Sequence, residues 1–230
     1  MPAITPLGDS AITITFGDTI DENTNKQVLG AFNYLKEKNI AGVKDIIPAY
    51  ASLTLVYDII TILENNVCIS AYDFMRTEME SVLQNFHSGI TEESKLVRIP
   101  VCYHVSLGTD LEEMSAQKNI SIEEIIRLHS SATYRVYMIG FLPGFAYMGK
   151  VDERIAIKRK ASPKNVVAGS VGIAELQTGI YPFDSPGGWN IVGQTPMPLF
   201  SKNFIEPCLL CPGNTVKFEP ITLKEFYELK

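Results

Sequence analysis

The sequence predicts a small α+β domain over residues 1–90, followed by a mainly β barrel over residues 91–230. In the first 90 residues, apolar positions at helical spacing alternate with short strand patterns. Beyond a polar stretch at 88–94, which suits a linker, many short strand patterns are separated by turns, as is typical of a closed or nearly closed barrel. Residues 140–200 hold most of the chain's 16 glycines and nearly half of its 13 prolines, which excludes one long helix there.

The N-terminal domain begins with a strand and a capped helix. Ala11–Phe16 alternates apolar residues with threonines, which predicts a half-buried strand. Asp21 can cap a helix that runs to about residue 38, with its apolar residues on one stripe. Two more strands are expected over 43–47 and 52–57, and Ser70 is a good N-cap for a second helix. This order of elements predicts a small α+β unit.

The second domain is expected to start with a strand over 96–101 and to carry helices on the rim of its barrel. One helix is expected over 110–117 and another from Ser121 to about residue 130, where Ser121 and Glu124 have the spacing of a capping box. A short C-terminal helix is expected over 223–229. The remaining strand patterns occupy 133–139, 166–174, 177–181, 189–193 and 215–219.

The composition is that of a soluble globular protein and excludes some partners. Of the 230 residues, 46% are hydrophobic and 20% are charged, and the net charge is −6. There is no long basic run, so we expect no nucleic acid partner. We find neither a signal-peptide pattern nor an apolar run long enough to cross a bilayer, so we expect a cytoplasmic protein with no membrane partner.

The four cysteines offer one possible metal pattern. Cys208 and Cys211 have CxxC spacing, and Cys102 lies two residues before His104. Tetrahedral zinc sites use such ligands, but a strong zinc pattern needs two close pairs in turns, and here two leucines fill the CxxC gap in an apolar run. We therefore interpret the cysteines as buried thiols that pack as small hydrophobes, and we expect no metal site.

His129 is the candidate for proton transfer. It follows Ile122, Ile125 and Ile126 at helical spacing, which puts it on the apolar stripe of the predicted helix. The spacing alone favours a core histidine whose ring nitrogens are satisfied by backbone groups. The alternative is a general acid/base or a ligand donor at the mouth of the barrel, because the next strand leads into the glycine-rich block.

Arg159 is the candidate for binding an anion. It lies in a basic run that is followed by Ser162 and a proline, which stiffens the chain. An arginine held near the backbone N–H groups of residues 169–172 would suit a carboxylate or a phosphate, whereas the alternative is a solvated basic face. Neither a GxxxxGK[ST] nor a GxGxxG loop is present, so ATP cannot be assigned to a known phosphate-binding loop.

Other residues of the glycine-rich block are candidates for binding a neutral group. Trp189 is the only tryptophan, and its ring forms either the floor of a pocket or part of the packed interior of the barrel. Gln177 and Thr178 offer neutral hydrogen bonds that fit an amide-like substrate. The chain has no GxSxG elbow, no HExxH and no defensible Ser–His–Asp set, so we do not expect catalysis to reside wholly in this chain.

Three segments of the block resemble a known family. They read IGFLPGFAYMG, SPKNVVAGSVGIAELQTGIYPFDSPGGW and VGQTPMPLF. Together they resemble the signature of the 5-oxoprolinase B subunit, whose family also includes KipI, the sporulation kinase inhibitor, and allophanate hydrolase subunit 1. The resemblance is strongest from about residue 129 to residue 200, and the order of domains before it agrees.

The resemblance implies a cyclophilin-like barrel and one component of an ATP-dependent 5-oxoprolinase, which opens 5-oxoproline to glutamate together with its C and A subunits. ATP would be used at the level of the complex. The same family implies two alternatives: a KipI-like inhibitor that binds a sensor histidine kinase, or a component of a biotin-dependent carboxyltransferase or allophanate-type amidolyase. The resemblance also implies catalytic residues, namely His129, Arg159 and Ser162, and substrate-binding residues, namely Gly169, Ser170, Gln177, Thr178, Tyr181, Gly187, Gly188 and Trp189.

The chain departs from the family pattern at several positions. Glu175 and Lys150 stand where glycine is usual, and Lys158 stands where proline is usual. Arginine is common at the positions of Lys164 and Gln194. Gln194 lacks the guanidinium with which an arginine would bind an anion through two hydrogen bonds. The resemblance therefore defines the fold more closely than the substrate.

Overall fold

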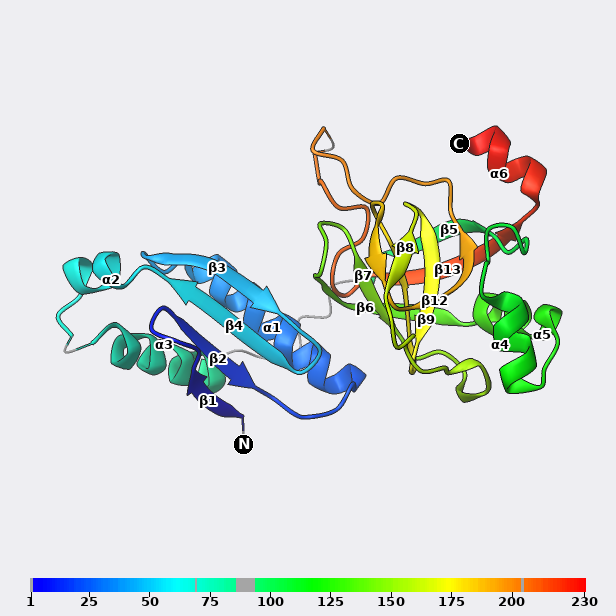
Figure 1. Cartoon of the computed structure of the whole chain (residues 1–230). Helices are drawn as coiled ribbons and strands as arrows, with labels where there is room; N and C mark the ends of the chain where they lie inside the picture. Colours follow the sequence, from blue (N-terminus) through cyan, green and yellow to red (C-terminus); the bar gives the residue numbers. More distant parts are fainter. Residues whose placement is uncertain (1, 69, 86–93, 204) are drawn as a thin grey trace. The chain divides into compact units, whose positions relative to one another are not determined.

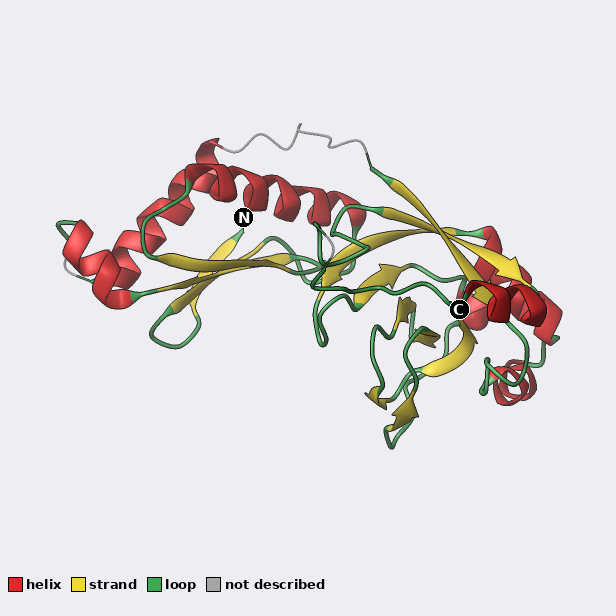
Figure 2. Cartoon of the chain, turned by 90° about the horizontal axis from the view of Figure 1, so that it is seen from above, coloured by secondary structure: helices red, strands yellow, loops and turns green. Residues whose placement is uncertain are grey.

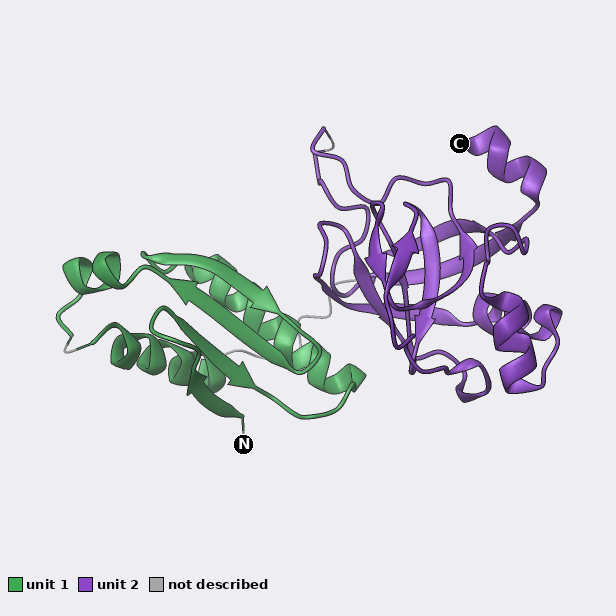
Figure 3. Ribbon diagram, viewed as in Figure 1, with its two compact units in different colours: residues 1–93 green, residues 94–230 purple. Residues whose placement is uncertain are grey.

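The computed structural model describes residues 2–68, 70–85, 94–203 and 205–230. The chain divides into two compact units, residues 1–93 and 94–230 (Figures 1 and 3). Each unit has its own hydrophobic core. Apart from Ser94, the expected linker at 88–94 lies outside the described residues. No helix in the described ranges is long and apolar enough to cross a bilayer.

The first unit is an antiparallel sheet with two long helices on one face. Its elements are β1 Ala3–Pro6, β2 Ala11–Thr15, α1 Glu22–Lys38, β3 Val43–Pro48, β4 Ser52–Tyr57, α2 Ile59–Asn65 and α3 Ala71–Asn85. The strands pair in the order β1-β2-β4-β3. Both α1 and α3 pack on the same face of this sheet, as Figure 2 shows. The core of the unit fills the space between the helices and the sheet.

The predicted caps form in this unit. Asp21 accepts a hydrogen bond from the Thr24 N–H at 2.8 Å, and Ser70 accepts one from the Asp73 N–H at 3.1 Å. The predicted order of elements omitted β1 and α2. Strand β1 is short and lacks an alternating burial pattern, and α2 follows β4 directly with Asp58 as its cap.

The second unit is a closed barrel with helices beside it. Its elements are β5 Leu96–Cys102, α4 Leu111–Lys118, α5 Ile122–Ser131, β6 Thr133–Ile139, β7 Ala146–Gly149, η1 Glu153–Ile155, β8 Lys164–Val166, β9 Ser170–Ala174, β10 Gln177–Ile180, β11 Ser185–Gly187, β12 Asn190–Gln194, β13 Thr215–Ile221 and α6 Leu223–Leu229. The barrel closes in the order β10-β7-β6-β13-β5-β12-β9, while β8 and β11 pair separately. Within the barrel β13 and β5 are parallel, and the other pairs are antiparallel.

The predicted fold class, an α+β unit followed by a mainly β barrel, is confirmed. Several details differ in the second unit. Strands β7 and β11 and the short helix η1 were not expected, and the strand expected over 166–174 is broken by a turn, since Gly169 has a positive φ of 81°. Apolar side chains fill the interior of the barrel, so a binding site has to lie outside that interior.

Candidate functional site

A cavity of about 280 Å³ lies on the outer face of strands β7, β9 and β10. Side chains on these strands alternate, so Met148 and Ile173 belong to the barrel core while Tyr147 and Ala174 belong to a separate outer cluster. Strand β11 and the loop 140–145 complete the wall. The lining residues are Phe141, Phe145, Tyr147, Arg159, Pro163, Ala174, Glu175, Gln177, Tyr181, Pro186, Gly187, Gly188 and Trp189.

Aromatic rings form much of this wall and meet edge to face. The ring centroid of Phe145 lies 5.4 Å from that of Trp189 and 5.1 Å from that of Tyr181, with interplanar angles of 90° and 80°. Gly179 makes room for the indole, because a Cβ there would lie 3.0 Å from the Trp189 ring. Trp189 is 5% exposed and therefore forms a packed floor.

Arg159 is exposed and lines this cavity, and its backbone is fixed on both sides. The Lys160 N–H donates to the Gly188 carbonyl at 2.8 Å, and the Asn190 side chain donates to the Lys158 carbonyl at 2.9 Å. Among the described residues, none forms a hydrogen bond or an ion pair with the Arg159 guanidinium. The cavity therefore has a cation whose donors are available to a ligand.

The charge of Arg159 also reaches two tyrosines of the wall. Burial raises the pKa of Tyr147 and of Tyr181, and the Arg159 guanidinium partly offsets both rises. The Trp189 backbone also lowers the pKa of Tyr181, by more than Arg159 does. A cavity with one available guanidinium and aromatic walls suits a small anion that has an apolar body.

A second cavity, of about 510 Å³, shares Arg159 and Glu175 with the first. Basic side chains outnumber acidic ones in its wall, although the net charge of the chain is −6. Lys160 is paired, because its Nζ lies 2.5 Å from Oδ2 of Asp110, and these side chains are only 16% and 7% exposed. The lining residues are Glu113, Gln117, Lys118, Ala156, Ile157, Lys158, Arg159, Lys160, Glu175 and Asn190.

His129 lies in the barrel core, the position that its spacing favoured, and not at the mouth of the barrel, where the alternative placed it. It is fully buried, with Nδ1 2.8 Å from the Tyr103 hydroxyl and Nε2 2.8 Å from the Thr178 hydroxyl. Burial lowers the pKa of His129 to about 3, so the ring is neutral at pH 7. Because His129 lines neither cavity, we propose that its role is structural.

Other residues predicted to form the site also lie away from both cavities. Ser162 is exposed and lines neither of them, while Ser170 and Thr178 are buried in the barrel wall. The N–H groups of Gly169 and Ser170 donate to backbone carbonyls. These two N–H groups are therefore not available to bind the anion that we expected beside residues 169–172.

The first cavity brings together part of the predicted site and adds residues that the sequence reasoning missed. The predicted residues that line it are Arg159, Gln177, Tyr181, Gly187, Gly188 and Trp189. The lining residues outside the predicted site are Phe141, Phe145, Tyr147, Pro163, Ala174, Glu175 and Pro186. Phe145 and Tyr147 stand two residues apart at the start of β7, which is the spacing of one strand face and could have been used, whereas Phe141 lies in the loop before it. Glu175 stood out in the sequence only as a departure from the glycine that is usual at this position.

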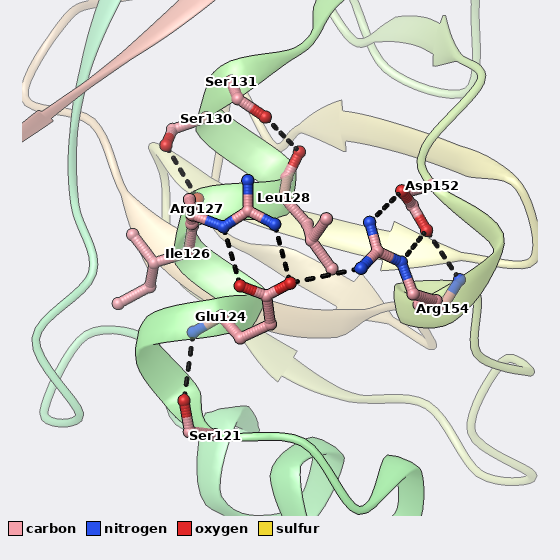
Figure 4. A network of polar contacts seen from close by, with 9 residues as sticks. All are labelled: Ser121, Glu124, Ile126, Arg127, Leu128, Ser130, Ser131, Asp152 and Arg154. Carbon is pink, nitrogen blue, oxygen red and sulfur yellow. Dashed lines mark hydrogen bonds and ion pairs between the residues drawn. The ribbon is translucent and has the colours of Figure 1, made fainter.

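An exposed polar network ties helix α5 to the turn η1, which leads into the cavity walls (Figure 4). Glu124 accepts hydrogen bonds from Arg127 at 2.7 Å and from Arg154 at 3.2 Å, and Asp152 accepts from Arg154 at 2.8 Å. Arg127 lowers the pKa of Glu124, and Arg154 lowers that of Asp152 to about 2. Ser121 caps α5 as predicted, but the Glu124 carboxylate serves this network instead of closing a capping box.

The cysteines do not form one buried set. Cys102 is buried, but Cys211 is exposed, which corrects the expectation that all four pack as small hydrophobes. In the part of the chain that the structure describes, no three His, Cys, Asp or Glu side chains are grouped so as to hold a metal ion.

Comparison with known proteins identifies the family. Residues 2–210 match the family described as carboxyltransferase domain, subdomain C and D. The chain is 40% identical to the 5-oxoprolinase B subunit of Bacillus subtilis over 99% of this chain and 96% of that protein. It is 48% identical to the protein of the same name from Haemophilus influenzae over 55% of this chain and 60% of that protein. The chain therefore belongs to the family of carboxyltransferase subdomains C and D that includes the 5-oxoprolinase B subunit, as its resemblance predicted.

Solved structures agree with the fold. A protein from Pyrococcus horikoshii is 38% identical, with a TM-score of 0.56 over 97% of this chain and 100% of its own. Another solved chain is 32% identical, with a TM-score of 0.79 over 92% of this chain; the match spans 40% of that longer chain. Urea amidolyase of Kluyveromyces lactis shows the fold alone, at 17% identity and a TM-score of 0.75 over 99% of this chain and 15% of that chain.

Proposed function

We propose that the chain is the B subunit of an ATP-dependent 5-oxoprolinase, which opens 5-oxoproline to glutamate together with partner subunits. The observation that carries this proposal is the aromatic cavity in which the unpaired Arg159 lies in one wall with the amide of Gln177. The Bacillus subtilis relative, matched over nearly the whole chain, supports the proposal with its name.

Each part of 5-oxoproline has a counterpart in this cavity. The substrate is a five-membered lactam that carries a carboxylate. Arg159 would bind the carboxylate, since a guanidinium fork matches its two oxygens. Gln177 would meet the amide edge, because its side chain both donates and accepts. The rings of Phe145 and Trp189 would cover the methylene groups and exclude water.

The second cavity fits the phosphates of ATP by its charge. Lys118, Lys158 and Arg159 line it without forming an ion pair to any described residue. When bound, ATP supplies a phosphoryl group that activates the lactam carbonyl. The residues of this chain would hold the phosphates next to the substrate cavity, because Arg159 belongs to both walls.

The activity requires partner subunits in this proposal. The described walls of the two cavities contain no histidine, and their carboxylates are exposed, so the remaining groups for hydrolysis would come from homologues of the C and A subunits. The longer solved relative supports this arrangement, since the fold there forms part of a larger chain. A cytoplasmic location belongs to the same proposal.

The test is reconstitution of the chain with homologues of the C and A subunits, followed by measurement of ATP-dependent glutamate release from 5-oxoproline. We expect turnover in the wild type and its loss in Arg159→Ala, with assembly unchanged. Arg98→Ala is the matched control, because it removes an exposed arginine outside both cavities. Full turnover in Arg159→Ala overturns the role of Arg159. Copurification with a sensor histidine kinase and no turnover would support the inhibitor alternative instead.

A further inference from the structure

Glu175 has a backbone conformation that few side chains adopt. With Leu176 it forms the connection between β9, which ends at Ala174, and β10, which starts at Gln177. Its φ is 51°, in the left-handed region. Two-residue hairpin connections that need a positive φ usually carry glycine, asparagine or aspartate there, because a longer side chain is strained.

The surrounding structure imposes this conformation. The Glu175 N–H donates to the Ile157 carbonyl at 2.7 Å, and the Val151 N–H donates to the Leu176 carbonyl at 2.9 Å. Glycine at position 175 would make the same backbone hydrogen bonds without the strain. The backbone conformation therefore does not explain why glutamate occupies this position. Backbone strain that is retained in a cavity wall indicates that the side chain has a function.

The carboxylate of Glu175 has no partner in the described part of the chain, although Arg159 lines the same two cavities. In the first cavity these two residues are the charged members of the wall. They form no ion pair with each other, so the cavity offers a ligand one cation and one separate anion. An ionised carboxylate only accepts hydrogen bonds.

We infer that Glu175 determines specificity by accepting a hydrogen bond from a ring N–H of the ligand whose carboxylate binds Arg159. This inference rests on the proposed function and sharpens it. The ligand class is a small ring that bears both a carboxylate and an N–H group, as 5-oxoproline does. A ring in which oxygen replaces the N–H would bring its lone pairs against the Glu175 carboxylate, and its binding would suffer.

The fluorescence of Trp189 reports binding directly, because it is the only tryptophan and lines the cavity. We would use it to titrate the full chain by itself with 5-oxoproline and with the matching five-membered lactone carboxylate, and we would titrate the assembled complex with the same two rings by calorimetry. The wild type is expected to bind the lactam roughly tenfold or more tighter than the lactone, as a hydrogen bond to a charged group allows. Glu175→Gln and Glu175→Gly are expected to lose most of this preference.

The glycine variant adds a readout that a structural role would not produce. Because it relieves the strain, Glu175→Gly is expected to melt at the same temperature as the wild type or higher, while binding the lactam more weakly. Glu153→Gln, an exposed glutamate outside both cavities, is the matched control and should change neither property.

Several outcomes overturn the inference. They are an unchanged lactam preference in Glu175→Gly, a clear loss of stability in that variant, and no saturable response of the wild type to either ring. The proposed function fails separately. If the preference depends on Glu175 but the assembled complex releases no glutamate, the binding inference stands and the proposed reaction does not.

Discussion

The Nε2 atom of His129 lies 2.8 Å from the hydroxyl oxygen of Thr178, and this bond belongs to a hydrogen-bond chain with a single direction. Thr178 donates its hydroxyl proton to the Gly172 carbonyl at 3.1 Å, so it accepts from His129. The Nδ1 atom then accepts from the Tyr103 hydroxyl. With Phe218 stacked 4.7 Å from its ring centroid, His129 is a neutral link between α5 and the barrel.

The first prediction concerns the pH dependence of stability. Burial lowers the pKa of His129 to about 3, whereas the pKa in an unfolded chain is about 6.5. Between these values the unfolded chain binds a proton that the folded chain does not, so the free energy of unfolding falls as pH drops below 6.5. The contribution is about 1.4 kcal/mol per pH unit within this window. Urea titrations at pH 7, 6 and 5 measure it.

Two variants isolate this contribution. His129→Gln is expected to be less stable at pH 7 but to lose less stability on acidification than the wild type. His104→Gln removes an exposed histidine and is expected to follow the wild type. If the wild type and His129→Gln show the same pH slope between 6.5 and 5, the assignment is wrong.

The second prediction concerns the ion pair between Lys160 and Asp110. Asp110 also accepts a hydrogen bond from the Ile191 N–H at 2.7 Å, so this carboxylate holds two parts of the second unit together. Asp110→Asn is expected to lower the free energy of unfolding by about 3 kcal/mol, because it leaves a largely buried lysine without its partner. The double variant Asp110→Asn/Lys160→Met should recover part of the loss. Additive losses in denaturant titrations would contradict this coupling.

The third prediction compares two neighbouring glycines. A Cβ at Gly187 would lie 2.4 Å from the Tyr181 hydroxyl oxygen, whereas one at Gly188 would find its nearest neighbour at 3.6 Å. Gly187→Ala is therefore expected to cost about 1–3 kcal/mol of stability and to shift the fluorescence of Trp189. Gly188→Ala should do neither. Equal melting temperatures for the two variants would show that the wall at Tyr181 is not tightly packed.

The fourth prediction concerns Phe141 in the wall of the first cavity. Its side chain is 60% exposed, its φ is 69°, and its ring meets Phe145 edge to face at 5.6 Å. Phe141→Ala is expected to weaken 5-oxoproline binding several-fold, since one aromatic contact is lost, with little change in melting temperature. Phe183→Ala, an exposed aromatic outside the cavity, is the control. Titration of Trp189 fluorescence measures both, and equal affinities would rule out a contact with Phe141.

The positions of helices and strands followed closely from local patterns. Asp21 and Ser70 cap their helices, and the strand expected over 133–139 has those bounds in the structure. Such features depend on neighbours within a few residues, so a single sequence reveals them. Strand β1 escaped prediction because a short edge strand gains its stability from its partner β2 and carries little pattern of its own.

The composition of the site was only partly predictable for a similar reason. Arg159 and Trp189 stand out in sequence because of their residue types, and the structure places both in the first cavity. The apolar stripe of His129 favoured the core position that the structure shows, but it did not identify the side chains of Tyr103 and Thr178 as its partners. Glu175 was noted in the sequence only as a departure from a usual glycine, because its position in two cavity walls arises only when the hairpin pairs with the segment at Ile157.

By itself the sequence determined the fold class, the succession of most elements and the family, since these rest on periodicity, caps and a long run of matching residues. The tertiary structure decided which face of each barrel strand is inside, and so which side chains share a cavity. Closure of the barrel turns Met148 and Ile173 inward and leaves Tyr147 outside with Trp189. That choice depends on the pairing of strands far apart in the chain, which no local pattern encodes.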